Sequence, residues 1–300
     1  MSQGDARDAR LRRRSRTVVG CTLVGILLAP LVWSLLSKGG FGRDAAVVGV
    51  VEVTGVISLL AERPWDEQGD VGFVLEQLAQ ARQAPEIRAL VVRINSGGGS
   101  AAASQELHRA ILRVRQAGKP VVISMAETAA SGGYYVAVAG DRILANPATV
   151  TGSIGVIVQY PNFAGLSERV GFTYETVKTG EFKDTGNPTR AMTARERAVI
   201  QELVDDTLDQ FVEAIAAGRG LNPETVRRIA DGRVLTGRQA LELGLIDGFG
   251  GLEEAIELAA ELAGIEEPEV RRFRRDAPWY VKLLSGIFLP TRADWPRLLP

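Results

Sequence analysis

Residues 17–37 form a run of 21 residues without a charged side chain. This run constrains the structures that the 300-residue chain can adopt more than any other feature does. Because an α-helix rises about 1.5 Å per residue, about 20 apolar residues span the hydrocarbon core of a bilayer. The run contains Pro30, which a membrane helix tolerates, and Trp33 near its far end, where an indole suits the interface. The sequence therefore predicts one transmembrane helix.

The charges before this run predict its orientation. Six arginines precede it within residues 1–16, and positive charge favours the cytoplasmic side: Arg7, Arg10, Arg12, Arg13, Arg14 and Arg16. A cleaved signal peptide has the same order of parts. The uncharged run is longer than the usual signal-peptide core, and residues 37–40 form no clean cleavage site, which favours an uncleaved anchor. We expect a single-pass protein of the cell membrane with its body on the extracytoplasmic side.

Composition narrows the possible partners. The net charge is −1, but residues 1–16 carry +4 and residues 271–300 carry +5, so the stretch between them carries −10. An acidic body argues against nucleic-acid binding, which needs clustered Lys and Arg. The one cysteine, Cys21, lies in the apolar run, so the exported part has no disulfide.

After a glycine-rich linker, residues 38–46, strand and helix patterns alternate through a predicted domain at 47–265. Strands are expected at 47–57, 87–94, 121–125 and 142–145, and helices near 71–78, at 101–116 and at 132–139. A mostly helical stretch follows at 193–262. This alternation predicts an α/β fold with a mainly parallel sheet, whose functional residues follow the carboxyl ends of strands.

Two glycine-rich loops follow such strands. Residues 95–100 (NSGGGS) form a predicted turn whose backbone N–H groups can approach a ligand, although a tight turn before a helix has the same composition. In residues 127–133 (ETAASGG), Ser131 stands at a helix start, where its hydroxyl is exposed for nucleophilic attack. The competing interpretation is a helix N-cap, the commonest role of a serine at that position.

A serine nucleophile needs a base. The single histidine, His108, lies in the middle of a predicted helix, so a Ser-His-Asp triad would require that helix to fold back on the second loop. A lysine is the alternative, and Lys178 and Lys183 lie in a segment broken by glycine and proline. Phe182 could help to exclude water from such a base, whereas Asp184 would strengthen its hold on the proton.

Four segments together resemble the signal peptide peptidase A family, membrane-anchored Ser-Lys peptidases with the fold of the Clp protease and crotonase superfamily. They read VVRINSGGGSAAAS, AASGGYYVAVAGDRILANPATVTGSIGVI, VKTGEFKDTGNPTRAMTARER and GRVLTGRQALELGLIDGFGG, within residues 47–263. The resemblance implies Ser131 as nucleophile, Lys183 as general base and Ser153 as the lysine's hydrogen-bond partner. It also implies an oxyanion hole formed by the N–H groups of Gly98 and Gly132.

The resemblance further implies a ββα superhelix, homo-oligomeric assembly, and neither cofactor nor metal. The implied reaction is endopeptidase cleavage of short apolar peptides such as residual signal peptides. A catalytically weak crotonase-like scaffold that binds partners at the membrane is the alternative, and an acyl-CoA enzyme is disfavoured because CoA is cytoplasmic.

Two features depart from the family pattern or lie outside it. Gly97 replaces the proline usual in the first loop, so the loop should be looser without losing its N–H donors. The basic and amphipathic tail, residues 266–300, matches no family motif; a membrane contact, a subunit clamp and a packing arm are all compatible with it.

Overall fold

The computed structural model describes residues 46–59 and 71–273. Contacts divide the chain into residues 1–45 and 46–300, and only the second unit contains described residues. The predicted cytoplasmic segment, the transmembrane run 17–37 and nearly all of the linker lie outside them, as does the tail from residue 274. Among the described residues, no helix is both long and apolar enough to cross a bilayer.

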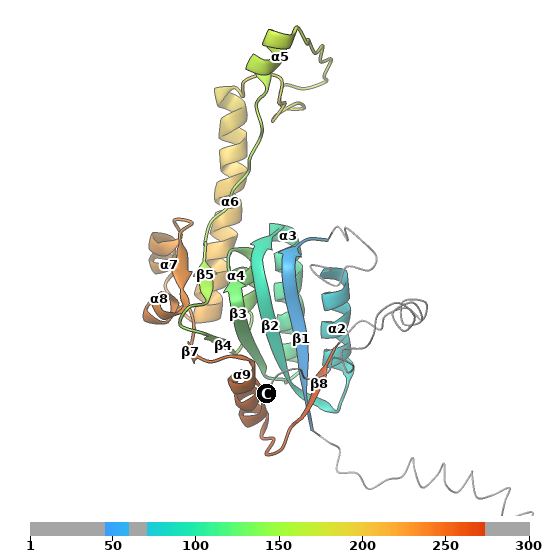
Figure 1. Cartoon of the computed structure of the whole chain (residues 1–300), viewed down its shortest axis with the longest axis vertical. Coiled ribbons are helices and arrows are strands. Elements are labelled where there is room, and N and C mark those ends of the chain that lie inside the picture. Colours follow the sequence, from blue (N-terminus) through green and yellow to red (C-terminus); the bar gives the residue numbers. More distant parts are fainter. Residues whose placement is uncertain (1–45, 60–70, 274–300) are drawn as a thin grey trace, which may run out of the picture. The chain divides into compact units, whose positions relative to one another are not determined.

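A mostly parallel sheet forms the centre of the second unit (Figure 1), which confirms the predicted α/β class. The ββα superhelix stays a prediction. The strands are β1 (Val47–Ile57), β2 (Ile87–Gly99), β3 (Val121–Ala129), β4 (Arg142–Ala145), β5 (Val150–Gly152), β6 (Val234–Thr236), β7 (Gly248–Phe249) and β8 (Glu269–Arg272). Their order is β6-β5-β3-β2-β1-β8, and β4 pairs with β3 and β7. Among the described strands, only β5 and β6 pair antiparallel. Strand β8, from the predicted tail, pairs with β1.

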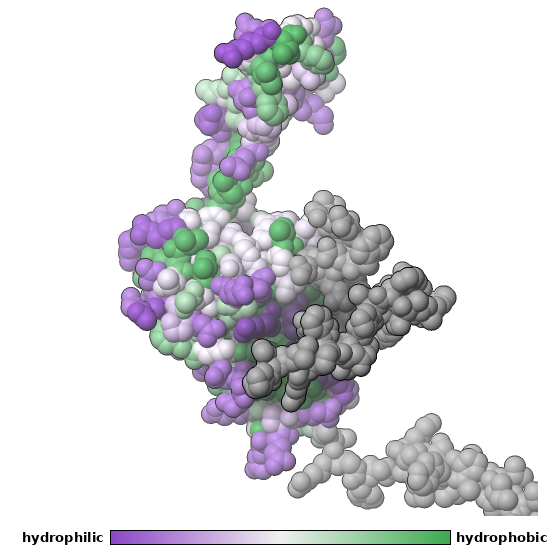
Figure 2. All heavy atoms as spheres, in the orientation of Figure 1, coloured by the Kyte–Doolittle hydropathy of each residue, from purple (hydrophilic) through white to green (hydrophobic). Residues whose placement is uncertain are grey.

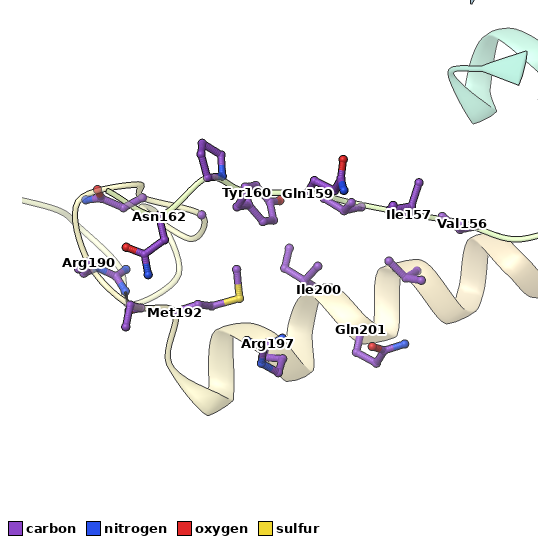
Figure 3. Close-up of a pocket in the computed structure, with 16 residues that line it drawn as sticks. Val156, Ile157, Gln159, Tyr160, Asn162, Arg190, Met192, Arg197, Ile200 and Gln201 are labelled. Atoms are coloured by element: carbon purple, nitrogen blue, oxygen red, sulfur yellow. Dashed lines mark hydrogen bonds between the residues drawn. The ribbon is translucent and has the colours of Figure 1, made fainter. Parts of the chain in front are cut away.

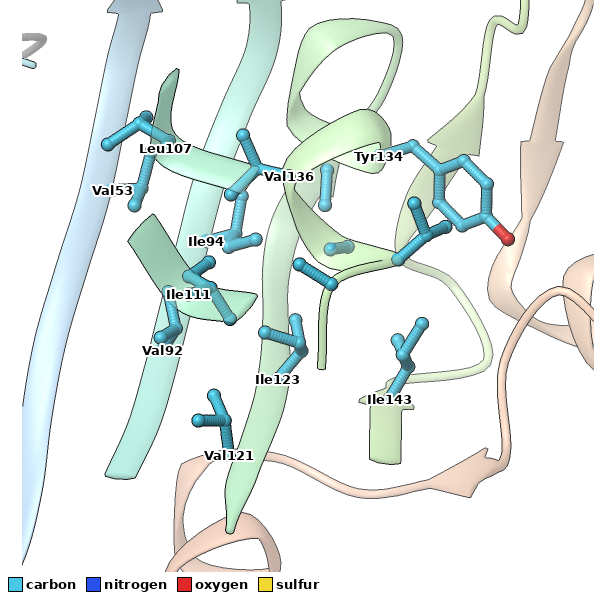
Figure 4. Close-up of a cluster of buried hydrophobic side chains, with 14 of the residues drawn as sticks. Val53, Val92, Ile94, Leu107, Ile111, Val121, Ile123, Tyr134, Val136 and Ile143 are labelled. Atoms are coloured by element: carbon cyan, nitrogen blue, oxygen red, sulfur yellow. The ribbon is translucent and has the colours of Figure 1, made fainter. Parts of the chain in front are cut away.

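Helices cover both faces of the sheet. They are α2 (Val71–Gln83), α3 (Ala101–Gln116), α4 (Gly132–Ala137), α5 (Ala164–Val170), α6 (Ala194–Arg219), α7 (Pro223–Ile229), α8 (Gly237–Glu242) and α9 (Leu252–Ala263). Alternate residues of β2 face opposite clusters: Leu90, Val92 and Ile94 pack with α2, α3 and α4, whereas Ala89 and Val91 pack with α9. Burial of both faces explains the nearly continuous apolar strands. Figure 4 shows the larger cluster, with Ile94, Leu107 and Ile123 among its members.

Both glycine-rich loops are shorter than predicted. Residues 95–99 are not a turn, because β2 continues to Gly99 and pairs there with the end of β1 (Val56 with Gly98, Ile57 with Gly99). Strand β3 likewise continues to Ala129, opposite Ser96. Glycines have weak strand propensity, so tertiary pairing decided these residues. Helix α4 begins at Gly132 as predicted and ends at Ala137, two residues before the predicted end.

Residues 153–193, which we name the arm, connect β5 to α6 and are mostly exposed. Helix α6 begins with a capping box, in which Thr193 accepts from the Glu196 N–H and Glu196 accepts from the Thr193 N–H. Its second half buries Phe211, Val212, Ile215 and Ala216, while Glu196 is the only buried residue of its first half. Figure 1 shows α6 reaching from the sheet to the part of the arm that contains α5.

Candidate active site

Ser131 stands in a strained backbone conformation between β3 and α4. Its φ is 51° and that of Ser153 is 50°, and in the described part of the chain these are the only non-glycine residues with positive φ. Such conformations cost about 1 to 3 kcal/mol each and concentrate at functional sites. The Ser131 N–H donates to the Gly152 carbonyl (2.9 Å) and the Ser153 N–H to the Arg233 carbonyl (2.8 Å). The fold thus places both predicted serines next to one another through Gly152.

The Ser131 hydroxyl is not used as a helix cap. Although Ser131 is the N-cap residue of α4, its side chain makes no capping hydrogen bond. The helix is held by its other residues instead: Tyr134 is fully buried, and its O–H donates to the Leu245 carbonyl (2.8 Å). The N-cap role weighed for the Ser131 side chain is therefore wrong, and no capping bond holds the hydroxyl back from attack.

The two predicted oxyanion glycines meet beside Ser131. A Cβ atom on Gly98, which has a φ of 103°, would lie 2.7 Å from the Gly132 nitrogen and 2.9 Å from the Ser131 Cβ. A Cβ atom on Gly132 would lie 2.4 Å from the Ser104 Oγ. Since real Cβ atoms do not approach so closely, only glycine lets the two backbones come together here.

The two N–H groups differ in availability. The Gly132 N–H is the first of α4, and such a group has no acceptor within its helix. The Gly98 N–H already donates to the Ser96 Oγ (3.1 Å), whose own hydroxyl donates to the Gly55 carbonyl (2.6 Å). An oxyanion would therefore have to replace Ser96 as acceptor of the Gly98 N–H, a partner that the sequence did not reveal.

Ser131 borders a cavity of about 330 Å³. Its walls come from the start of α3, the start of α4, residues 155–158 of the arm and one face of α6. The α6 residues Leu203, Thr207 and Phe211 recur every four positions, so they share that face. Sequence reasoning missed them and also missed Tyr135, although the spacing within α6 was visible.

His108 lies outside this cavity. Its ring makes an edge contact with Tyr135 (centroids 5.1 Å apart), and Tyr135 in turn packs against Phe211 (5.2 Å). Burial lowers the pKa of His108 to about 4, and the charges of Arg109 and Arg115 add to this effect. His108 thus supports the site through packing on Tyr135, and the geometry gives no support to a histidine base.

The predicted base, Lys183, lies on the arm and not at Ser131. The Lys183 side chain is exposed. The backbone N–H of Lys183 donates to the Gly180 carbonyl (3.2 Å) in a turn. The neighbouring Phe182 ring lies 5.5 Å from the Arg195 guanidinium, near the start of α6, whereas the Ser131 cavity reaches Phe211. The cavity is lined by α6 from Leu203 to Phe211, and from Arg195 the helix rises about 12 Å to the first of these and about 24 Å to the second. One copy of the chain therefore does not bring Ser131 and Lys183 together.

A second cavity, of about 650 Å³, lies along the arm (Figure 3). It lies between the extended residues 156–162 and the first half of α6, with Ile200 and Met192 among its lining residues. Val156, Ile157 and Val158 line both cavities, so one segment of the arm connects the Ser131 site to this groove. In residues 46–59 and 71–273, no cluster of three or more His, Cys, Asp or Glu side chains is placed to bind a metal ion.

An α/β fold with a strained, uncapped serine opposite two glycine backbones is the arrangement expected of an enzyme with a serine nucleophile. The profile of "Peptidase family S49" matches residues 113–266. A Synechocystis protein provisionally named a protease is 40% identical over 220 residues, which cover 73% of this chain and 76% of that protein. An Enterococcus faecium protein provisionally named a signal peptide peptidase is 33% identical over 253 residues, covering 84% and 72%. The chloroplast serine protease SPPA of Arabidopsis thaliana is 34% identical over 262 residues, covering 85% and 38%. The chain belongs to peptidase family S49.

Proposed function

We propose that this peptidase is a membrane-anchored serine endopeptidase that cleaves short apolar peptides, including residual signal peptides, with Ser131 as nucleophile and Lys183 as general base. The observation that carries the proposal is Ser131 itself, with its strained backbone, its uncapped hydroxyl and the two glycines opposite. The names of the Enterococcus and Arabidopsis relatives agree with a signal peptide peptidase that uses a serine.

The chemistry follows from these positions. The Ser131 Oγ attacks the substrate carbonyl, and the neutral Lys183 amine accepts the hydroxyl proton and later passes it to the leaving amine. The Gly132 N–H stabilises the negative charge that develops on the carbonyl oxygen. Ser153, held beside Ser131 through Gly152, orients the amine. Arginine cannot take the place of this lysine because it does not lose its proton in proteins.

Lys183 would come from a second copy of the chain. Within one copy it is separated from Ser131 along α6, and its exposed side chain is free to reach another molecule. The arm also exposes large apolar side chains, including Phe163 (52%), Leu166 (61%), Phe172 (58%) and Val177 (101%). Figure 2 shows such apolar residues gathered on this part of the surface. Exposed apolar surface of this extent is typical of protein interfaces, so we expect a homo-oligomer.

The cavity beside Ser131 favours an apolar peptide side chain. Tyr135, Leu203 and Phe211 line it with Val156 and Ile157, and no charged side chain of the described residues is in its lining. Burying an unpaired charge there would cost several kcal/mol, whereas burying an alkyl group is favourable. The groove that continues along residues 156–158 has room for further residues of an extended peptide.

For the membrane anchor, the proposal depends on residues 17–37 and on the arginines before them, all outside the described residues. Residues 1–16 would be cytoplasmic and residues 39–300 extracytoplasmic. Protease added to intact spheroplasts should then degrade the body of the protein. Protection of the body under those conditions, with degradation after lysis, would reverse the proposed topology.

The mechanism is tested by labelling and by substitution. A fluorophosphonate should label wild-type protein and leave Ser131→Ala unlabelled. Lys183→Ala and Lys183→Arg should both lose at least about 100-fold in kcat/KM on a fluorogenic apolar peptide, with unchanged circular dichroism. Lys178→Ala should keep most of its activity at alkaline pH. If neither labelling nor hydrolysis depends on Ser131, the protein is instead a scaffold that binds partners at the membrane.

A further inference from the structure

The turn that carries Lys183 contains an unusual distribution of charge pairs. Residues 178–196 include seven charged side chains. Six of them form the ion pairs Lys178–Asp184, Arg190–Asp184, Arg190–Glu196 and Arg195–Glu181. Lys183 is the seventh, and in the part of the chain that the structure describes it has no ion pair. It remains unpaired although a carboxylate, Asp184, is the next residue in the sequence.

Asp184 is already occupied on both carboxylate oxygens. Its Oδ1 lies 2.5 Å from the Lys178 Nζ and 2.9 Å from the Arg190 Nη2, and its Oδ2 accepts from the Arg190 Nε at 3.1 Å. Hydrogen bonds from Arg190 and Lys178 hold the pKa of Asp184 well below its ordinary value. The Asp184 carboxylate is therefore charged over the whole pH range in which the enzyme could work, and it attracts any free cation nearby.

Arg190 is itself anchored to α6. Its Nη1 and Nη2 lie 2.9 Å and 2.5 Å from the two carboxylate oxygens of Glu196, which is 1% exposed. Glu196 also accepts from the Thr193 N–H (2.8 Å) at the start of the helix. Lys178, Asp184, Arg190 and Glu196, which we name the clasp, thus form a neutral set of two cations and two carboxylates.

We propose that Lys178 and Arg190 are positioning residues for Lys183: by occupying the carboxylate of Asp184 they prevent it from pairing with the neighbouring amine. The inference rests on the proposed function of Lys183 as general base. An amine beside a carboxylate holds its proton more tightly, and a protonated amine cannot accept the proton of Ser131. The clasp leaves Asp184 with partners of its own, so that Lys183 stays exposed and accessible to the second copy of the chain that the proposed function requires.

The other charged and titratable groups that the structure describes around the turn do not form ion pairs with Asp184. Glu181 and Arg195 pair with each other (2.7 Å) on the Phe182 side. From the facing segment, the ring of Tyr160 packs against Gly186, where an added Cβ would be 2.4 Å from the Tyr160 Cε1. From α6, Arg197 lines the arm cavity together with Arg190. Among the described residues, only Lys178 and Arg190 form ion pairs with Asp184.

The experiment compares kcat/KM from pH 6 to 11 on one fluorogenic apolar peptide, using the full-length protein in detergent. Lys178→Met should move the midpoint of the acidic limb upward by about one pH unit, because Asp184 then keeps only Arg190 as an ion-pair partner and its Oδ1 can also pair with Lys183. The double variant Lys178→Met/Asp184→Asn should return the midpoint to the wild-type value. If the clasp only stabilises the turn, the double variant should not recover. Asp184→Asn also removes a partner of Arg190, so it should lower kcat/KM further.

Two further variants keep the test decisive. Glu181→Gln breaks a neighbouring ion pair in the same turn without touching Asp184, so its midpoint should equal that of the wild type. Lys178→Gln replaces Lys178→Met if the latter does not fold. The positioning role is overturned if the midpoint is unchanged in the Lys178 variant, or if it does not return in the double variant. In either case the proposed function still stands as long as Lys183→Ala is inactive. If Lys183→Ala is itself active, the proposed function fails and the inference fails with it.

Discussion

Ser131 and Gly98 show how single residues build this site. The Ser131 hydroxyl makes no capping bond in this conformation, but the residue is useful only because Gly98 allows a second backbone to reach the start of α4. Neither residue would be informative alone, since serines often cap helices and glycines often form turns. Their contact, which joins β2 to α4, gives both of them a catalytic interpretation.

Gly98→Ala should therefore lose about 100-fold or more in kcat, because its methyl group would lie where the Gly132 N–H faces the substrate oxygen. The matched control is Gly97→Ala, since a Cβ atom on Gly97 has no neighbour within 4 Å. The measurement is kcat for both variants, from full saturation curves, together with circular dichroism. Equal activity of the two variants would remove Gly98 from the oxyanion site.

His108→Gln tests the histidine alternative and the stability of the aromatic stack. Because the pKa of His108 is lowered from 6.5 to about 4, the unfolded chain binds a proton more readily than the folded protein does. The wild type should consequently lose stability as the pH falls from 6.5 towards 4. Over the same pH range the free energy of unfolding of His108→Gln should fall by about 1 to 2 kcal/mol less than that of the wild type. This difference is smaller than the full pKa shift of His108 would give, because the ring is partly exposed.

Urea unfolding at pH 7 and pH 4.5 measures this difference. In the same variant, the pH dependence of kcat/KM should keep the wild-type shape, with no limb near 6.5. A limb that disappears with His108 would restore the triad mechanism.

At the scale of elements, the placement of α6 against α4 determines where the arm begins relative to Ser131. Gly218 of α6 packs on the end of α4, and a Cβ atom there would lie 2.2 Å from the Val138 carbonyl oxygen. Helix propensity favours alanine over glycine by about 1 kcal/mol, but a backbone atom cannot move aside as a side chain can.

Gly218→Ala should thus destabilise the protein by about 1 to 3 kcal/mol and reduce activity through displacement of α6. Gly165→Ala is the control, because Gly165 lies in α5 with no atom within 4 Å of an added Cβ. That variant should be neutral or slightly stabilising by thermal unfolding. A stabilising effect at position 218 would show that α6 is not held at this contact.

The centres of the strands and helices were predictable from the sequence, but the ends of two strands were not. The centres of β1, β2, β3 and α3 were predictable because their apolar periodicity reflects burial on one or both faces. The ends of β2 and β3 were not, since residues 95–99 and 127–129 have the composition of loops. Their strand conformation depends on pairing with a neighbour that is distant in sequence.

At the scale of the whole molecule, the separation of Ser131 from Lys183 predicts complementation between copies. Ser131→Ala and Lys183→Ala should each be inactive. When the two are dissociated, mixed in equal amounts and reassembled, about a quarter of the sites should regain both residues if subunits combine at random. Activity of the mixture relative to the wild type measures this fraction. Mixed samples as inactive as the separate variants would place both residues in one copy.

The sequence by itself determined the residue types of this protein and their order: the uncharged run, the parallel α/β alternation, and the serine, lysine and glycine motifs. These are local properties, which depend on periodicity and on backbone preferences within a few residues. Tertiary structure alone decided that Ser131 is uncapped, that Ser96 binds the Gly98 N–H and that the clasp leaves Lys183 with no ion pair to any residue that the structure describes. It also decided that α6 separates that lysine from the serine. The Ser96 bond and the clasp join residues close in the sequence, but which donor meets which acceptor there depends on the path of the folded backbone. The placement of α6 beside Ser131 depends on contacts between residues far apart in the sequence, such as Gly99 and Phe211 in one cavity, whose partners no local pattern specifies.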